Sequence, residues 1–188
     1  MRSFLAIPLP DDLRRDAFAS RGVLAPKGDG WRFVREEGLH LTLRFLGEVD
    51  PSRRGALDDA WGEAARGTGP VALRLRGAGL FPATGRPRVL WLGVVEESEA
   101  SSLRLLAERI EGAARALGFP PDDRPFAPHV TLARARSGAR VSRPPIERIG
   151  DFGVFVAQHL VLYRSEPDRG GPRYRQDASY PLTAAKAP

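Results

Sequence analysis

The chain has 188 residues, 42% of them hydrophobic, so it can bury one substantial core or two small coupled lobes and is too evenly mixed to be disordered. Cysteine is absent, which excludes disulfides, thiolate nucleophiles and zinc sites with sulfur ligands. The net charge of +6 would attract an anionic partner, although almost all of the 29 basic residues are arginine, a bias that a GC-rich genome produces by itself. No stretch approaches the roughly 20 apolar residues of a membrane span, so we expect a cytoplasmic protein with no membrane contact.

Turn residues and hydrophobic periodicity predict alternating strands and helices in the first half of the chain. Asp11 and Asp12 after a proline are typical of a helix start, and Asp50 followed by Pro51 indicates another. The predicted elements, in order, are a strand over 1–8, a helix over 10–24, a turn over 26–30, a short strand over 31–34, a strand over 39–46 and a helix from 50 to the glycine at 67.

In the second half, alternating apolar residues predict a half-exposed strand from 71 toward Phe81. The apolar run over 89–95 is interpreted as a central strand buried on both faces. The remaining predicted elements are the longest helix over 98–117 with Ser98 as its cap, a proline-rich loop over 119–128, a strand over 128–134, a loop over 135–149 that is either functional or loose, a strand over 152–164 and a closing strand over 178–183. This order predicts an α+β protein, one domain over 1–188 with two similar lobes of sheet and outer helices.

One short motif, H-x-T-x, occurs once in each predicted lobe, at residues 40–43 and 129–132. Because side chains alternate faces along a strand, His40 and Thr42 point one way while their apolar neighbours point the other. The same parity puts His129 and Thr131 on one face. Each strand is therefore expected to fasten one face into the core and to present an imidazole and a hydroxyl on the other.

Two such faces would together form a site for acid–base chemistry. If the lobes are related by an approximate two-fold axis, the faces meet in a cleft with two imidazoles and two hydroxyls. Imidazole has a pKa of about 6.5, so a facing pair can accept a proton on one side of a reacting centre and donate one on the other. This suits in-line displacement at a phosphodiester and needs no metal. A single motif would more often be a surface histidine on a strand, but its repetition at equivalent places favours a site.

The third histidine, His159, falls in the strand predicted over 152–164. By parity it shares a face with Phe155, Val161 and Tyr163. We therefore interpret it as a half-buried histidine with a structural hydrogen bond and leave it out of the site.

The two motifs and their order resemble those of the RNA 2',3'-cyclic phosphodiesterases, also called 2'-5' RNA ligases, in the two-histidine (2H) phosphoesterase superfamily. The resemblance covers nearly the whole chain, and residues 2–10, 31–48, 87–93, 124–134 and 162–165 carry it. It implies a bilobal fold around a central cleft. It also implies hydrolysis of an RNA terminal 2',3'-cyclic phosphate to a 2'-phosphate, with weak reversible 2'-5' joining of RNA ends. We expect no cofactor and no metal.

By motif position, the resemblance also implies residue roles. His40 resembles the general acid that protonates the departing O3', and His129 resembles the base that activates water. Thr42 and Thr131 resemble the hydroxyls that bind the phosphate.

Two further positions, Arg134 and Phe45, resemble a phosphate-contacting cation and the platform on which the terminal base stacks. Each lies five positions after its histidine, an odd step that strict alternation sends to the opposite face. Both can reach the cleft only if the strands twist, bulge or end there.

Two other functions stay open at this stage. The chain could be a non-catalytic nucleotide-binding module, or an enzyme for a small nucleotide such as ADP-ribose cyclic phosphate. Turnover of a cyclic-phosphate dinucleotide separates the first from an enzyme, and comparing oligonucleotides with mononucleotides addresses the second. We expect a monomer whose partners are RNA ends or oligonucleotides with a 2',3'-cyclic phosphate.

Overall fold

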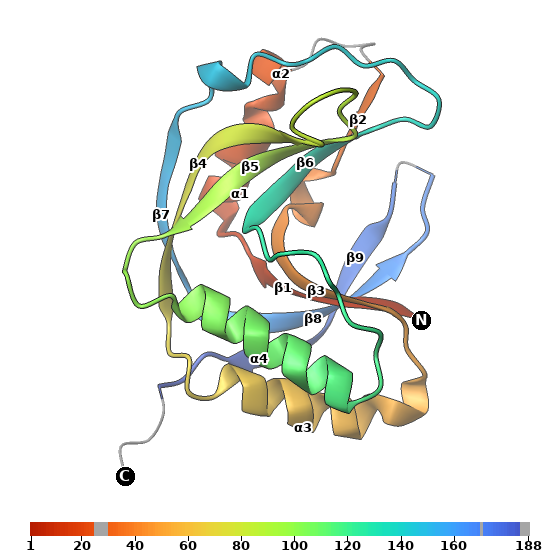
Figure 1. Ribbon diagram of the computed structural model, residues 1–188, viewed down its shortest axis with the longest axis vertical. Helices are drawn as coiled ribbons and strands as arrows, with labels where there is room; N and C mark the ends of the chain where they lie inside the picture. Colours follow the sequence, from red (N-terminus) through yellow and green to blue (C-terminus); the bar gives the residue numbers. More distant parts are fainter. Residues whose placement is uncertain (25–29, 170, 185–188) are drawn as a thin grey trace.

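One curled antiparallel sheet organises the backbone (Figure 1). The computed structural model describes residues 1–24, 30–169 and 171–184, and nine strands lie within these ranges. The strands are β1 (Arg2–Pro8), β2 (Trp31–Phe33), β3 (His40–Glu48), β4 (Val71–Phe81), β5 (Val89–Glu96), β6 (His129–Ala135), β7 (Asp151–Ala157), β8 (His159–Glu166) and β9 (Arg173–Pro181).

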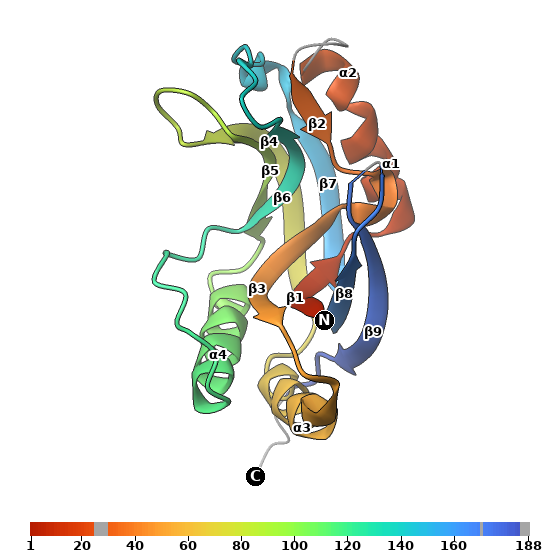
Figure 2. The same ribbon diagram turned by 90° about the vertical axis from the view of Figure 1, so that its right-hand side faces the viewer.

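The sheet has two halves with the same plan. Its spatial order is β7-β4-β5-β6-β3-β1-β8-β9, with β2 added beside β6, so β3 and β6 are the innermost strands of two four-stranded halves. The halves meet where Leu41 of β3 lies opposite Val130 of β6. In Figure 2 the strands of the two halves run apart from this junction. The predicted α+β architecture of two similar lobes is confirmed.

The helices lie outside the sheet. They are α1 (Asp11–Ala19), α2 (Arg21–Leu24), α3 (Arg54–Ala65) and α4 (Ser102–Ala116), with three short 3-10 turns, η1 (Glu36–Gly38), η2 (Pro51–Arg53) and η3 (Ile146–Arg148). α3 and α4 pack side by side below the sheet (Figures 1 and 2), and α1 contacts β7. The apolar stripes predicted for both longer helices face the core, because Trp61 of α3 and Ile110 of α4 are fully buried.

The helix predicted from residue 10 begins where expected, but the longest helix begins later than expected and has another cap. The helix expected over 10–24 breaks at Ser20, whose hydroxyl donates to a carbonyl of α1. The longest helix starts at Ser102, and its cap is not Ser98. The Glu96 carboxylate instead accepts from the backbone N–H groups of Ser102 and Leu103, at 2.9 and 3.0 Å. A carboxylate satisfies these free donors and also suits the positive end of the helix dipole.

The expectation that β5 is buried on both faces is wrong. Leu90, Leu92 and Val94 are buried, but Trp91 is only partly buried and Val95 is 43% exposed. β5 is an interior strand, between β4 and β6, as predicted. Its second face carries Trp91, Gly93 and Val95, which are partly or largely exposed, so no second core layer covers it.

The single strand predicted over 152–164 is also wrong, because the chain breaks at Gln158 and forms β7 and β8 in opposite halves of the sheet. No glycine or proline marks the break. It also invalidates the parity count for His159, which is exposed at the start of β8 rather than half-buried. The closing strand begins at Arg173, earlier than expected.

Two remaining expectations concern a turn and membrane contact. The turn predicted over 26–30 lies, apart from Gly30, outside the described residues. Among the helices of the described ranges, none is long and apolar enough to cross a membrane.

Candidate active site

The two H-x-T-x motifs begin the two innermost strands of the sheet. His40 is the first residue of β3, and His129 is the first residue of β6. Their neighbours Leu41 and Val130 are fully buried, whereas both histidines are partly exposed. The predicted division of each strand into a core face and a polar face is therefore confirmed over the motif itself.

Both imidazoles are held by the same local hydrogen bond. Nδ1 of His40 lies 2.7 Å from the carbonyl oxygen of Gly38, and Nδ1 of His129 lies 2.7 Å from that of Ala127. A carbonyl oxygen can only accept, so Nδ1 carries the hydrogen in each ring. Nε2 is then the nitrogen left for a substrate, with a lone pair while the ring is neutral. Two rings fixed in the same tautomer by equivalent bonds form a matched pair.

The two threonines lie beside the opposite histidines. At an antiparallel junction with Leu41 opposite Val130, the residues on either side pair crosswise, which brings His40 toward Thr131 and Thr42 toward His129. Both threonines are partly exposed, and within the described ranges neither hydroxyl has a hydrogen-bond partner in the protein. The two hydroxyls are therefore available to an anion near the junction.

A β-bulge at the last residue of each motif interrupts the alternation, so the residues directly after it change face. In β3, Thr42 pairs with Ala6 and Arg44 with Leu5, so Leu43 has no partner on β1. The consequence is visible in the burial, because Leu43 and Arg44 are both buried although they are consecutive. One extra residue in the strand moves Phe45 to the face of His40.

The second bulge is at the matching position of β6. Thr131 pairs with Trp91 and Ala133 with Leu90, which leaves Leu132 without a partner on β5. Leu132 and Ala133 are both buried, and Arg134 is exposed on the face of His129. The odd five-residue step noted in the sequence is thus compensated in both strands by the same device.

Aromatic rings surround His40, and the sequence alone did not identify them. Phe4 stacks on the imidazole with ring centroids 4.7 Å apart, and Tyr163 lies 5.3 Å from Phe4 and 5.8 Å from His40. Tyr174 meets His40 edge-on at 5.1 Å, and Phe45 is 5.8 Å from Phe4. Except for Phe45, these rings come from β1, β8 and β9, so only the strand order brings them to the motif.

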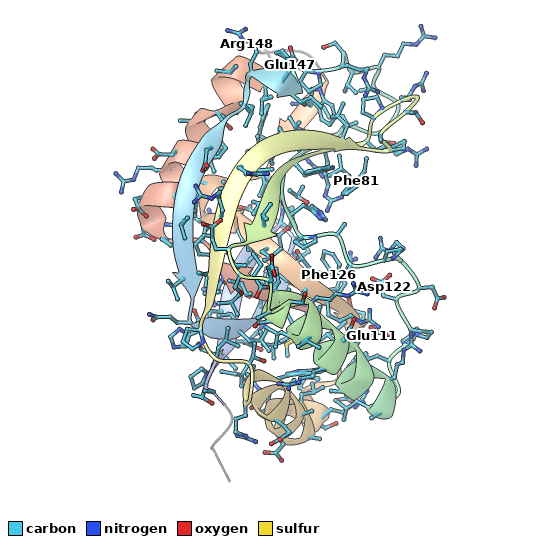
Figure 3. The ribbon with its side chains drawn as sticks, turned by 60° about the vertical axis from the view of Figure 1, so that its left-hand side comes forward. Phe81, Glu111, Asp122, Phe126, Glu147 and Arg148 are labelled. Atoms are coloured by element: carbon cyan, nitrogen blue, oxygen red, sulfur yellow. The ribbon has the colours of Figure 1, made fainter. Side chains whose placement is uncertain are left out.

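His129 has aromatic neighbours from β4 and β5. Phe81 meets its ring edge-on at 5.1 Å, and Trp91 lies 6.2 Å away. Trp91 lies over Gly79, where an added Cβ would overlap the indole ring. Gly79 is therefore required for close approach of the indole to β4. Figure 3 shows Phe81 and, below it, Phe126 of the loop before His129 on the same open side of the sheet.

Burial and nearby charge keep both histidines neutral in the protein alone. Burial lowers the pKa of His40 from 6.5 to about 4; the bond to Gly38 opposes this shift, and the charges of Arg134 and His129 add to it. The pKa of His129 is also lowered, again mainly by burial, with Arg134 and Arg124 contributing. A phosphate anion would supply the opposite charge and favour the protonated imidazole.

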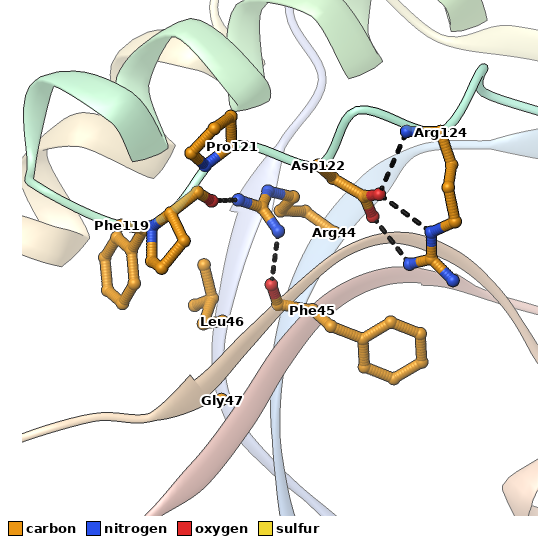
Figure 4. A pocket seen from close by; sticks show the side chains of 9 residues that line it. Arg44, Phe45, Leu46, Gly47, Phe119, Pro121, Asp122 and Arg124 are labelled. Carbon is orange, nitrogen blue, oxygen red and sulfur yellow. Dashed lines mark hydrogen bonds and ion pairs between the residues drawn. The ribbon is translucent and has the colours of Figure 1, made fainter.

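Phe45 borders a pocket of about 250 Å³ between β3 and the loop over 119–124 (Figure 4). Arg44 is one of the residues that line it. The Arg44 guanidinium lies 2.7 Å from Glu111 of α4 and donates to the carbonyl oxygens of Phe45 and Pro120. Phe45 itself is 49% exposed, which leaves one ring face free for a ligand. Arg44 therefore ties the strand of His40 to the loop that leads to His129.

The third histidine, which is not part of the site predicted from the sequence, lies elsewhere. His159 lies at the start of β8, paired with Pro181, and takes no part in the ring contacts of the other histidines. Within the described ranges, no group of three or more histidine, aspartate or glutamate side chains could hold a metal ion. The loop over 135–149 is held by Arg143, which donates to the carbonyls of Ala83 and Gly85.

The sequence of this chain is similar to those of a known family and of several known proteins. The family described as LigT like phosphoesterase matches residues 7–91 and 94–174. The RNA 2',3'-cyclic phosphodiesterase of Geobacillus stearothermophilus is 34% identical over 97% of this chain, which spans 57% of that protein's length. The Escherichia coli protein of the same name is 34% identical over 97% of both chains.

Two solved structures have a fold similar to that of this chain. A crystal structure from Thermus thermophilus is similar over the full length of both chains, with a TM-score of 0.84 and 34% identity. The E. coli LigT complexed with 3'-AMP is similar over 96% of this chain and 97% of that one, with a TM-score of 0.77 and 32% identity.

Proposed function

Because the chain belongs to the LigT-like phosphoesterase family, we propose that it hydrolyses RNA terminal 2',3'-cyclic phosphates to 2'-phosphates by paired-histidine catalysis without a metal. The observation that carries this proposal is the matched pair itself. His40 and His129 come from equivalent strands, each with Nδ1 bound to the carbonyl two residues earlier. Reversible 2'-5' joining of RNA ends would use the same groups in reverse.

In the proposed reaction, water attacks phosphorus as the bond to O3' breaks. Nε2 of His129, neutral as its lowered pKa favours, takes the proton from water. His40 gives a proton to the departing O3', so the phosphate remains on O2'. Both rings are neutral in the protein alone, so their protonation does not distinguish the acid from the base. We therefore assign the two roles from the positions of the histidines in the family motif. For His40, the bound anion raises the pKa and supplies the acid form.

The remaining proposed roles concern the phosphate and the terminal base. Thr42 and Thr131 donate their hydroxyl hydrogens to the equatorial oxygens, and Arg134 adds a positive charge. Phe45 stacks with the terminal base over the pocket beside it. The bulges support both later assignments, since they turn Arg134 and Phe45 toward the histidines.

We further propose that residues 1–188 act as one bilobal domain, with each lobe contributing one H-x-T-x strand, and that the protein is a cytoplasmic monomer. The split of the sheet into matching halves around the β3–β6 junction supports the first point. Light scattering on the purified protein measures the oligomeric state.

The test is turnover of a dinucleotide that ends in a 2',3'-cyclic phosphate, with the product identified by phosphorus NMR. We expect a 2'-monophosphate. Mainly 3'-phosphate would reverse the assigned orientation of the two histidines. Tight binding without turnover would make the protein a nucleotide-binding module, and turnover of ADP-ribose cyclic phosphate in preference to RNA would make it a small-nucleotide enzyme.

A further inference from the structure

Two arginines face each other across neighbouring strands close to the site. In the β2–β6 pair, Arg32 lies directly opposite Arg134, so the two side chains share one face of the sheet. Both are exposed, and neither has a carboxylate or hydrogen-bond partner within the described ranges. Like charges directly opposite each other destabilise a strand pair. The pairing therefore leaves a concentrated positive charge that the protein itself does not neutralise.

Some arginines near this pair, in contrast, contact carboxylates. Arg35, three residues beyond Arg32, lies 2.7 Å from Asp168. Arg74, on β4 of the same half of the sheet, contacts both Glu97 and Asp151 at 2.7 Å. The charges of these two arginines are thus neutralised by carboxylates of the protein, whereas those of Arg32 and Arg134 are not. An external anion is the simplest partner for a pair that is not.

A small pocket lies against these two side chains. We call it the Arg32 pocket; it is lined by Arg32, Phe33, Val34, Arg35, Arg134, Gly171, Pro172 and Tyr174. None of these residues is acidic. Its volume is about 120 Å³, which is enough for a phosphate group. The three arginines of this lining, with no acidic side chain among its residues, suit an anion of that kind.

The Arg32 pocket is continuous with the surroundings of His40. Tyr174 lines the pocket and also meets the His40 ring edge-on at 5.1 Å. Its ring packs against Gly38, whose carbonyl holds the imidazole of His40. Arg134 borders the pocket and lowers the pKa of both site histidines by its charge. A phosphate in the pocket would therefore lie next to the one between the histidines.

We propose that the Arg32 pocket binds the phosphodiester group that links the terminal nucleotide to the rest of the RNA, with Arg32 as its principal cation. This rests on the proposed function, since it assumes that the reacting cyclic phosphate lies between His40 and His129. It makes the protein selective for oligonucleotides over cyclic mononucleotides, which lack this second phosphate. Arg134 is shared between the two phosphates, whereas Arg32 serves only the upstream one.

The experiment compares two substrates, adenosine 2',3'-cyclic phosphate and the dinucleotide CpA with the same cyclic end. Arg32→Ala should lower kcat/KM for the dinucleotide about tenfold, the value of one charge-assisted hydrogen bond, and should leave the mononucleotide unchanged. Arg32→Lys should fall between, because it keeps the charge but loses the forked donor. The matched control is Arg15→Ala, which removes the same charge at an exposed position of α1, outside the sheet, and should affect neither substrate.

A second measurement does not depend on turnover. The affinity of wild type for CpA ending in a 2'-phosphate should exceed that for adenosine 2'-phosphate, and Arg32→Ala should remove most of the difference, as measured by calorimetry. In Arg32→Ala, the slope of log affinity against log salt for the dinucleotide should be smaller in magnitude by about 0.7 than in wild type, as expected for one lost phosphate contact on a single strand. Inorganic phosphate that weakens the binding of the dinucleotide and of the mononucleotide to the same extent in wild type would contradict the proposal. Such phosphate would occupy only the position between His40 and His129 and not the Arg32 pocket.

Equal losses for both substrates in Arg32→Ala, or no loss for either, would overturn the proposal. If wild type turns over neither substrate, the proposed function fails, and the calorimetry then decides this inference separately. Equal affinity of wild type and Arg32→Ala for the dinucleotide would reject the pocket as a phosphate site.

Discussion

Replacing Arg44 with methionine should destabilise the protein strongly, because this buried arginine forms an ion pair with one carboxylate and donates hydrogen bonds to two carbonyl oxygens. It is 8% exposed, its Nε lies 2.7 Å from Glu111 Oε2, and its other nitrogens donate to the carbonyls of Phe45 and Pro120. Methionine keeps most of the apolar stem but offers no donor. One carboxylate and two carbonyl oxygens then lose their partner in the interior.

The size of the effect follows from burial. Removing one partner of a buried ion pair costs about 3–5 kcal/mol. Glu111 is 22% exposed at its side chain and keeps Arg115 at 2.7 Å, which lowers the expected loss. We therefore expect a loss of about 3 kcal/mol in the free energy of unfolding. For a chain of this length, this corresponds to a fall in Tm of roughly 6–12 °C.

The assay is urea unfolding together with calorimetry, with a matched control from the same helix. Arg104 of α4 pairs with Glu108 at 3.0 Å, but both side chains are mostly exposed, so Arg104→Met should cost about 0.5 kcal/mol or less. Arg44 also ties the loop before His129 to β3, so Arg44→Met should lose activity at temperatures where it is still folded. A loss of stability no larger than that of Arg104→Met would refute the reasoning.

Three further predictions concern the site. The pH profile should be bell-shaped, and because His40 must be protonated and has a pKa of about 4 in the free protein, the basic limb of kcat/KM should lie at low pH. The basic limb of kcat should lie at higher pH, because the bound phosphate raises the pKa of His40. Basic limbs of kcat and kcat/KM at the same pH would contradict this. Gly79→Ala puts a Cβ into the indole ring of Trp91 and should lower the free energy of unfolding by about 1–3 kcal/mol, with a fall in kcat. The control is Gly112→Ala in α4, where an added Cβ meets nothing within 4 Å; urea unfolding should show its free energy of unfolding raised by up to about 1 kcal/mol. Hydrolysis should survive excess EDTA, and loss of activity restored by a divalent ion would reject the mechanism.

Much of the fold could be predicted because it depends on local patterns. Helical stripes such as that of Trp61 and turn residues such as Gly118, with φ +81°, mark element ends directly in the sequence. The failures occurred where tertiary context decides. β5 is apolar on both faces, yet only one face meets the core, and the break at Gln158 carries no turn residue. Strand order, which is non-local, could not be obtained from periodicity.

The candidate site shows the same division. Repetition of the motif selected His40 and His129 as candidates, and alternation predicted that Thr42 and Thr131 share their face; the structure has both pairs partly exposed. From the sequence, a bulge could be given only as one way for Phe45 and Arg134 to reach the face of the histidines. The bulges could not be placed at the end of each motif, because a bulge depends on the partner strand. The rings around His40, from β1, β8 and β9, left no signal near the motif.

The most direct test of the paired-histidine mechanism is single-turnover hydrolysis of a cyclic-phosphate dinucleotide by wild type and by the His40→Ala, His129→Ala and double variants. Each single variant should be slower by about 10²–10⁴-fold, since a positioned acid or base typically contributes that much. The double variant should be less impaired than the product of the two, because both groups act on one displacement. His159→Ala should match wild type. A folded His40→Ala or His129→Ala protein with near-normal turnover would show that these histidines bind the phosphate without performing the chemistry, and would contradict the mechanism.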